Sequence, residues 1–206
     1  LVVDPLSHVD IERGTLELAE SPGGGATFRQ RDDETRYEEV LSVLGEGGHT
    51  SGGAYLRQRS AIDLGVAARA RPLTIASFSF GNLGGGGGAE REQFVIGGFA
   101  SPLVDSLYDA RRVDAPAYPL ASATGPGFTA YRLAVPVAPF ALFYSGASTD
   151  FFRHPLRSYG AELQERVPAI AALGTPAVDV LTGIARAVDE PVKGQWRYYV
   201  SLAVRP

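Results

Sequence analysis

Histidine, hydroxyl and carboxylate side chains are the groups that could do chemistry in this sequence, which contains three histidines. His8 stands near Asp4 and Asp10, and an imidazole with carboxylates is a ligand set that zinc accepts. The same spacing in a polar segment is equally typical of a solvated surface. We therefore predict no metal site and no cofactor.

Two other segments contain the residue types of a hydrolase. His49 is followed by Thr50 and Ser51, and Asp150 and His154 would form a Ser-His-Asp triad with any nearby serine. Neighbours in sequence seldom have the geometry that acyl transfer needs, and the motif G-x-S-x-G is absent. We assign no catalytic residue, and an enzyme is the third of three hypotheses for the function.

Arginines on one side of alternating segments form a more informative set. We predict that seven charged residues face the interior of a β-barrel: Arg57, Arg59, Asp63, Arg69, Arg71, Arg132 and Arg197. Rings of arginine favour anions in a pore, whereas internal pairing would join them to acids such as Asp179, Asp189 and Glu162. Because the chain has 23 acidic and 19 basic residues, internal pairing is favoured. A filled interior would make such a barrel a scaffold rather than a pore.

The element that positions four of these arginines is a long alternating segment, Ala54 to Arg71. Since successive side chains of a strand point to opposite faces, the arginines share one face. The other face is largely apolar and consists of Leu56, Ser60, Ile62, Leu64, Val66 and Ala68. Strands of soluble sheets usually run about five or six residues, whereas roughly nine to eleven cross the hydrocarbon layer of a membrane. The segment predicts a membrane-spanning strand.

The last segment, Trp196 to Arg205, repeats this pattern, with Tyr198, Val200 and Leu202 on one face. Two distant segments thus indicate one architecture. The predicted fold class is all-β: an antiparallel transmembrane β-barrel of roughly eight to twelve strands with a short loop helix. Residues 54–206 would form the barrel and residues 1–53 a polar, β-rich N-terminal segment, together treated as one domain.

Weaker signals complete the expected element order. We expect strands over His8 to Glu20, Ala26 to Leu44, Leu73 to Gly81, Gln93 to Ala100, Gly127 to Val137, Phe140 to Tyr144 and Gly160 to Val167. Glycine-rich turns are expected at Gly45 to Gly53 and Asn82 to Ala89, and a loop at Ser145 to Tyr159. Pro72 is expected to interrupt the strand ladder, because proline lacks an amide donor.

Two segments carry helix signals. Ser101 to Arg112 begins with a capping serine and a proline, which predicts one or two helical turns. Thr175 to Glu190 fits a helix with an apolar stripe, but also a strand that turns at Lys193-Gly194 into the last segment. The helix is the better capped of the two, although Gly183 weakens it. We prefer the strand, because Lys193-Gly194 looks like a turn that joins this segment to the last one.

Composition sets limits on the function. A net charge of −4 argues against a general nucleic-acid binder, and the absence of cysteine excludes disulfides and thiolate sites. The chain begins at Leu1 and has no methionine, so we expect a mature or trimmed product. The most apolar stretch, Phe128 to Tyr144, is broken by an arginine and two prolines, which argues against a spanning α-helix.

Four segments carry a resemblance to a known family. They read FVIGGF at Phe94 to Phe99, RSYGAEL at Arg157 to Leu163, GIARAVDEP at Gly183 to Pro191 and WRYYVSL at Trp196 to Leu202. The succession resembles the C-terminal barrel portions of surface-antigen-type bacterial outer-membrane proteins and covers roughly residues 54–206. The resemblance implies a porin-like barrel of the cell envelope. This chain departs from the family by ending in Val204-Arg205-Pro206 rather than in an aromatic residue, and it lacks the arginine-containing lid-loop motif of the Omp85 translocators.

Two main hypotheses follow. The first is an outer-membrane barrel with a structural or channel-like role, with membrane lipid and other envelope proteins as partners and no nucleic acid. The second is a secreted or periplasmic α+β binding module, in which Ser101 to Arg112 and Thr175 to Glu190 are helices on a twisted antiparallel sheet.

Overall fold

The computed structural model describes residues 15–21, 23–32, 37–50, 53–68, 71–85, 93–99, 111–167 and 177–205. These residues form strands and turns, with no helix among them. In particular, none of them belongs to a helix long and apolar enough to span a membrane. The all-β part of the predicted fold class is confirmed. The predicted helix at Ser101 to Arg112 lies outside the described residues except for Arg111 and Arg112.

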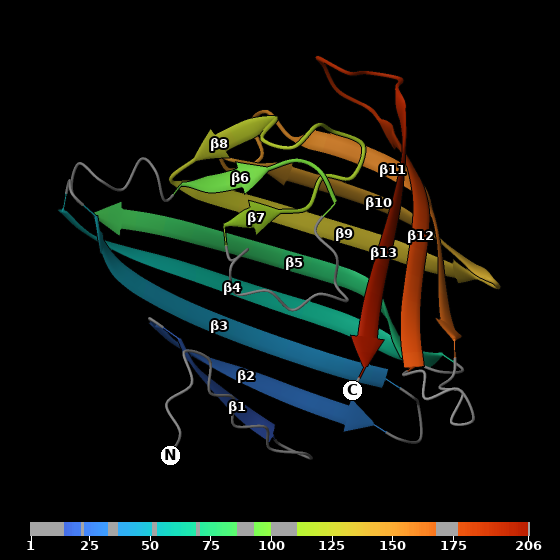
Figure 1. Cartoon of the computed structure of the whole chain (residues 1–206), viewed down its shortest axis with the longest axis horizontal. Coiled ribbons are helices and arrows are strands. Elements are labelled where there is room, and N and C mark those ends of the chain that lie inside the picture. Colours follow the sequence, from blue (N-terminus) through green and yellow to red (C-terminus); the bar gives the residue numbers. More distant parts are fainter. Residues whose placement is uncertain are drawn as a thin grey trace.

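Ten strands form one antiparallel sheet in which each strand pairs with the next one of the sheet along the chain (Figure 1). They are β1 (Thr15–Ser21), β2 (Gly23–Asp32), β3 (Tyr37–Thr50), β4 (Gly53–Ala68), β5 (Arg71–Gly85), β9 (Gly127–Val137), β10 (Phe140–Ser148), β11 (Leu156–Val167), β12 (Ala177–Ala187) and β13 (Trp196–Arg205). In this described sheet β1 and β13 are the two edges, so it is an open sheet and not a closed barrel.

The segment between β5 and β9 forms a second, small sheet. Its strands are β6 (Phe94–Ile96), β7 (Arg112–Val113) and β8 (Ala123–Gly125), with β6 in the middle. Gly97 follows β6 with a φ of 129°, and a Cβ there would lie 2.0 Å from the carbonyl oxygen of Pro119. Only glycine allows this close approach, which explains one glycine of FVIGGF. We call the described residues 93–99 and 111–126 the insert.

The long alternating segment is a strand from Ala54 to Ala68, as predicted, but its expected continuation to Arg71 is wrong, because Arg71 begins β5 and pairs with Ala68. β4 and its neighbours β3 and β5 have 14 to 16 residues each. The ladder does not stop at Pro72, which lies in β5 opposite Ala67, so the expected interruption there is wrong. A register shift occurs instead near Leu64 and Gly65. A proline close to a strand end costs the ladder little.

The segment Thr175 to Glu190 contains β12, so the strand interpretation is confirmed and the helix required by the α+β alternative is wrong. β12 pairs along its length with β11 on one side and β13 on the other. These long-range pairings outweigh the local capping signal for a helix.

Three expected loops are shorter than predicted. Within the expected loop Ser145 to Tyr159, Ser145 to Ser148 continues β10 and Leu156 to Tyr159 begins β11. Gly45 to Thr50 continues β3, and Asn82 to Gly85 belongs to β5. Pro136 belongs to β9, and the turn contains Ala138 and Pro139 instead. Neighbouring strands therefore extend through glycine-rich and polar residues that look like turns in the sequence. The pairing also runs across the expected boundary at residues 53 and 54, which lie in a β3–β4 hairpin.

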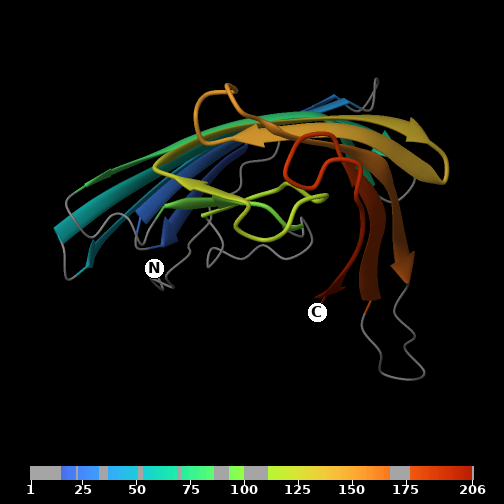
Figure 2. The same ribbon diagram turned by 90° about the horizontal axis from the view of Figure 1, so that it is seen from above.

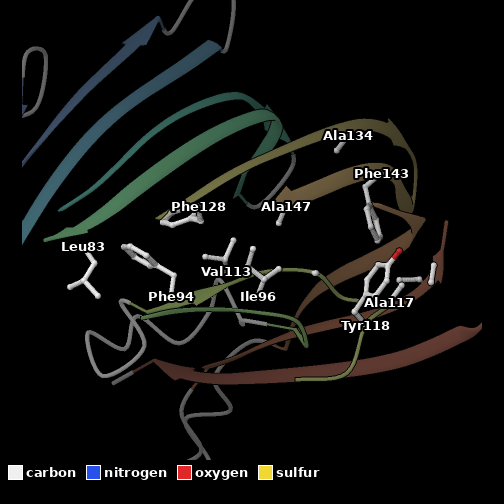
Figure 3. Packing of buried hydrophobic residues seen from close by; sticks show 13 residues of the cluster. Leu83, Phe94, Ile96, Val113, Ala117, Tyr118, Phe128, Ala134, Phe143 and Ala147 are labelled. Atoms are coloured by element: carbon white, nitrogen blue, oxygen red, sulfur yellow. The ribbon is translucent and has the colours of Figure 1, made fainter. Parts of the chain in front are cut away.

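The large sheet is arched, and the small sheet lies beneath the arch on its concave side (Figure 2). The buried core lies between the two. The insert contributes Phe94, Ile96, Val113, Ala115, Ala117 and Tyr118, and the large sheet contributes Leu83, Phe128, Ala134, Phe143, Ala147, Ala185 and Ala187 (Figure 3). The convex side of the large sheet has no such covering layer in the described part of the chain (Figure 2).

Candidate functional site

The convex face of the large sheet carries a continuous set of exposed apolar side chains. Leu56 is 64% exposed and Tyr198 is 80% exposed. The whole set is Leu41, Val43, Leu56, Ile62, Phe78, Phe80, Leu133, Val135, Val137, Phe140, Leu142, Tyr144, Tyr159, Val167, Trp196, Tyr198 and Val200. Soluble monomers rarely expose an apolar surface of this extent, and such surfaces often mark interactions with lipid or another protein.

Strand register joins these side chains into rows. Val135 pairs with Leu142, which pairs with Ala161, and the row continues through Ile184 to Tyr198. Directly paired residues share a face of the sheet. One row thus crosses five strands without a charged residue.

The concave face carries polar side chains beside the apolar ones that form the core with the insert. Ser79, Ser145, Ser158 and Ser201 are buried on it, and Ser145 and Ser158 hydrogen-bond to each other at 2.9 Å. Of the residues predicted to face the interior of a barrel, those that the structure describes also lie on this face, as their hydrogen bonds and strand pairings show. Asp63 on β4 is hydrogen-bonded to Ser77 on β5, and Arg197 pairs in register with the buried Ala185.

Two of the seven predicted interior residues cannot be placed. Arg69 lies outside the described residues, and the structure describes the backbone of Arg71 but not its side chain. Arg57 is 3% exposed and Arg132 is partly buried, which is unusual for arginine unless its charge is compensated. The Nε atom of Arg197 is buried without a hydrogen-bond partner among the described residues.

One interior cluster joins three strands that are far apart in the sequence. Arg132 on β9 donates to Oε2 of Glu162 on β11 at 2.5 Å, and the hydroxyl of Tyr199 on β13 donates to Oε1 at 2.6 Å. The guanidinium of Arg132 also lies 4.2 Å from the ring centroid of Phe143. Glu162 was among the predicted internal partners of the arginines, and here it pairs with one of them.

Tyr199 needs the glycine opposite it. Gly183 on β12 pairs in register with Tyr199, and a Cβ at this position would lie 2.3 Å from the tyrosine ring. An aromatic ring lying over a strand glycine shields the backbone that the missing side chain leaves open. The other side of the Tyr199 ring stacks on Phe99 of the insert, with centroids 4.2 Å apart.

The insert packs tightly against the concave face. Phe94, Ile96, Val113 and Tyr118 are almost fully buried, and the rings of Phe94 and Phe128 lie 4.7 Å apart (Figure 3). Burying a large apolar side chain contributes roughly 1.5–3 kcal/mol each. The insert therefore belongs to the folded core of the protein.

Arginines of the large sheet contact the insert directly. Nη1 of Arg59 donates to the carbonyl of Arg112 at 3.2 Å, and Nη2 of Arg112 donates to the carbonyl of Phe99 at 3.2 Å. The guanidinium of Arg57 lies 5.9 Å from the ring centroid of Phe94. These side chains hold the insert in place, so none of the three lines an open passage.

Hydrogen bonds of Tyr118 connect the insert to one end of the large sheet. Its hydroxyl donates to the carbonyl of Arg157 at 3.0 Å and accepts from the amide of Asp189 at 2.8 Å. Asp189 in turn binds the Arg157 guanidinium, which holds the pKa of that carboxyl below its usual range. Burial raises the pKa of the Tyr118 hydroxyl. Asp189 was predicted as an interior acid, and its partner Arg157 is not among the seven predicted residues.

The structure brings together one serine, aspartate and histidine, but in the wrong order for catalysis. Asp150 lies in the middle: the Ser148 hydroxyl donates to one of its carboxylate oxygens, and His154 Nδ1 contacts the other. A catalytic histidine must bind the serine hydroxyl itself. Ser148 is also buried while His154 is exposed. The three residues stabilise the turn after β10, and their hydrogen bonds hold the pKa of Asp150 below its usual range.

The other chemistry-bearing residues are not brought into a site by the described structure. His8 and Ser51 lie outside the described residues, as does the side chain of His49. No group of three or more histidine, aspartate or glutamate residues that could hold a metal occurs within the described ranges.

Sequence reasoning missed Tyr118, Phe99, Tyr199 and the role of the insert. The available signals were Gly183 in a strand, which marks a close approach, and the apolar segment FVIGGF that follows the glycine-rich stretch Asn82 to Ala89. Comparison with known proteins adds no assignment: no protein-family model, curated protein or solved structure matches this chain.

Proposed function

We propose that the large sheet is the wall of a transmembrane β-barrel in a bacterial outer membrane, and that this barrel is a scaffold filled by its own insert. The observation that carries the proposal is the contrast between the two faces of the sheet. The convex face exposes aliphatic and aromatic side chains, whereas the concave face carries Arg57, Arg59, Arg132, Glu162 and four serines beside the apolar core. A barrel wall between acyl chains and a polar interior requires this division.

Strand length supports the proposal. The strands from β3 to β5 and from β9 to β13 have 9 to 16 residues, and roughly nine to eleven residues cross the hydrocarbon layer when tilted. The up-and-down order is also the order of membrane barrels. Membrane lipid is then the main partner of the convex face.

A closed barrel also needs pairing between its first and last strands. In lipid, an unpaired strand edge leaves its amide and carbonyl groups without partners at a cost of several kcal/mol per group. We infer that β1 and β13 meet in the membrane and close the wall, or that an envelope protein pairs with them. The arch brings both ends of the sheet to its concave side, which favours closure (Figure 2).

The insert favours a scaffold over a pore. It occupies the concave side and is held by Arg59, Tyr118 and the Phe99–Tyr199 stack. Among the described interior arginines, Arg132 pairs with an acid, and Arg57 and Arg59 contact the insert. A selectivity site for anions would need such charges free toward water.

Bilayer insertion tests the proposal, and Trp196 is a native reporter because it is the only tryptophan and lies on the convex face. The purified chain should require detergent, should float with liposomes in a density gradient, and should lose Trp196 fluorescence when the acyl chains carry bromine. A chain that is monomeric and monodisperse in plain buffer, with unquenched Trp196, would overturn the proposal. It would favour a secreted or periplasmic binding module instead.

A further inference from the structure

The turn between β10 and β11 presents two phenylalanines in an unusual backbone conformation. Phe151 and Phe152 have φ values of 56° and 68°, so two successive residues with side chains occupy the left-handed region. Such residues are uncommon there, and aromatic residues are not among those enriched in it. Phe151 is 81% exposed, so its own burial does not stabilise this conformation.

Polar contacts within the turn hold it in this form. Asp150 accepts from the Ser148 hydroxyl and from the His154 amide at 3.1 Å, and it also contacts the His154 ring. The Ser148 oxygen in turn accepts from the amide of Asp150 at 3.2 Å. The carboxylate thus closes the turn by bonding residues on both sides of the two phenylalanines. Strain maintained by its surroundings often marks a functional position.

The rings continue the apolar convex face. Phe152 lies 6.3 Å from Phe78 on β5 and 5.7 Å from Tyr131 on β9, measured between ring centroids. Phe78 is part of the exposed apolar set, and the Tyr131 ring lies 6.0 Å from that of Tyr144, another member. Phe152 therefore packs onto the apolar convex face where β10 ends, beside the middle of β5.

Two basic residues follow the phenylalanines in the chain. Arg153 and His154 are exposed and follow Phe152 in the chain. Aromatic rings with adjacent basic groups at the end of a membrane-spanning strand suit the boundary between acyl chains and lipid phosphates. A protein partner would not require this position at the end of β10.

We propose that the Phe151–Phe152 turn is an interfacial anchor for an anionic lipid leaflet, with Phe151 at the boundary of the acyl chains and Arg153 beside the lipid phosphates. The inference rests on the proposed membrane function. It assigns to this turn a depth and a lipid preference that the barrel wall alone does not require.

A double variant measures the depth of the turn. In a Trp196→Phe background, Phe151→Trp places a single tryptophan in the turn, and the unaltered chain serves as the reference for the wall. Both are inserted into vesicles of phosphatidylcholine and phosphatidylglycerol that carry bromine either near the headgroup or deep in the acyl chain. We expect the turn tryptophan to be quenched more strongly by shallow than by deep bromine.

If Trp196 is quenched and the turn tryptophan is not, the anchor is wrong and the barrel stands. If neither is quenched, the barrel itself fails.

Lipid preference is measured with Arg153→Gln. Partition of this variant into vesicles with phosphatidylglycerol should weaken by roughly five-fold, the loss expected for one basic residue near an anionic surface, and partition into pure phosphatidylcholine should not change. An equal change in both vesicle types, or no change in either, would contradict the preference for anionic lipid. Far-ultraviolet circular dichroism of each variant shows whether the sheet remains intact.

Discussion

Glu162 shows how this protein keeps a carboxylate inside its fold. One oxygen accepts from Arg132 and the other from the Tyr199 hydroxyl, so both oxygens are occupied although the side chain is mostly buried. A buried charge is tolerated when it is paired and hydrogen-bonded in this way. Gly183 makes room for the ring that supplies the second donor.

Removing the Tyr199 hydroxyl should therefore be costly. Tyr199→Phe leaves one oxygen of Glu162 unsatisfied, and we expect the free energy of unfolding in detergent micelles to fall by about 1–3 kcal/mol. Tyr198→Phe is the matched control, because Tyr198 is the adjacent tyrosine on the opposite, exposed face. Urea or guanidinium titration of both variants measures the difference. Equal stabilities would show that the Glu162 contact contributes nothing.

The Arg157–Asp189 pair predicts a pH dependence. Because the pKa of Asp189 is lower in the folded state than in the unfolded chain, its contribution to stability is present above the unfolded value of about 4 and is lost as the pH falls through the folded value. The free energy of unfolding should decrease as the pH is lowered from about 5 towards 2. Asp189→Asn should flatten this decrease, whereas Glu190→Gln, at the exposed neighbouring carboxylate, should not. A pH series of unfolding curves with the same slope for all three proteins would contradict the prediction.

The insert is the element that decides whether the interior is open. It leaves the large sheet after β5 and returns at β9, yet Asn82 and Gly127 are paired, so the two strands already form a hairpin in the sheet. The insert is thus an addition to this hairpin that folds back onto the concave face. Its buried rings and the Tyr118 hydrogen bonds keep it there.

Deleting the insert should open a passage through the proposed barrel. Replacing residues 84–125 with a short glycine-containing turn joins β5 to β9 at their existing pairing, and removes the groups that fill the concave side. In planar bilayers we expect current steps from the shortened chain and none from the full chain. Replacing only Leu120 with alanine is the control, because this exposed insert residue is not part of the buried core. Equal conductance of the full and shortened chains would show that the insert does not block a passage.

The whole molecule is a sheet whose two faces suit different surroundings. Its convex face would be a liability in water, since large exposed apolar patches promote association. The same face is suited to a bilayer, where polar groups rather than apolar ones are costly. The surroundings of the protein can therefore be identified by placing a charge on this face.

Leu142→Arg is the discriminating substitution. Leu142 is 50% exposed on β10, so in water an arginine there should change stability by no more than about 0.5 kcal/mol. At mid-depth in a bilayer the same change should cost about 2–4 kcal/mol. Leu120→Arg is the matched control, because Leu120 is 60% exposed but lies in the insert, away from the convex face. Folding titrations into liposomes compare the two, and an equal effect would contradict the lipid assignment.

The alternation of side chains in the sequence was sufficient to predict much of the architecture. It predicted β4 and β13 and the division of Leu56 and Ile62 from Arg57, because a strand repeats every two residues and this period is visible locally. For β12, which also fitted a helix, the expected turn at Lys193-Gly194 decided the prediction. It also predicted acids as partners of the arginines, although it did not specify the Arg132–Glu162 pair.

Only the tertiary structure decided what fills the concave face and which groups meet there. The Tyr118 bonds join residues 39 and 71 positions apart, and the Tyr199–Glu162 bond spans 37. The order Ser148–Asp150–His154 and the left-handed Phe151 and Phe152 depend on hydrogen bonds that close one turn. Contacts across such distances depend on strand register and packing, which leave no period in the sequence for a local pattern to show.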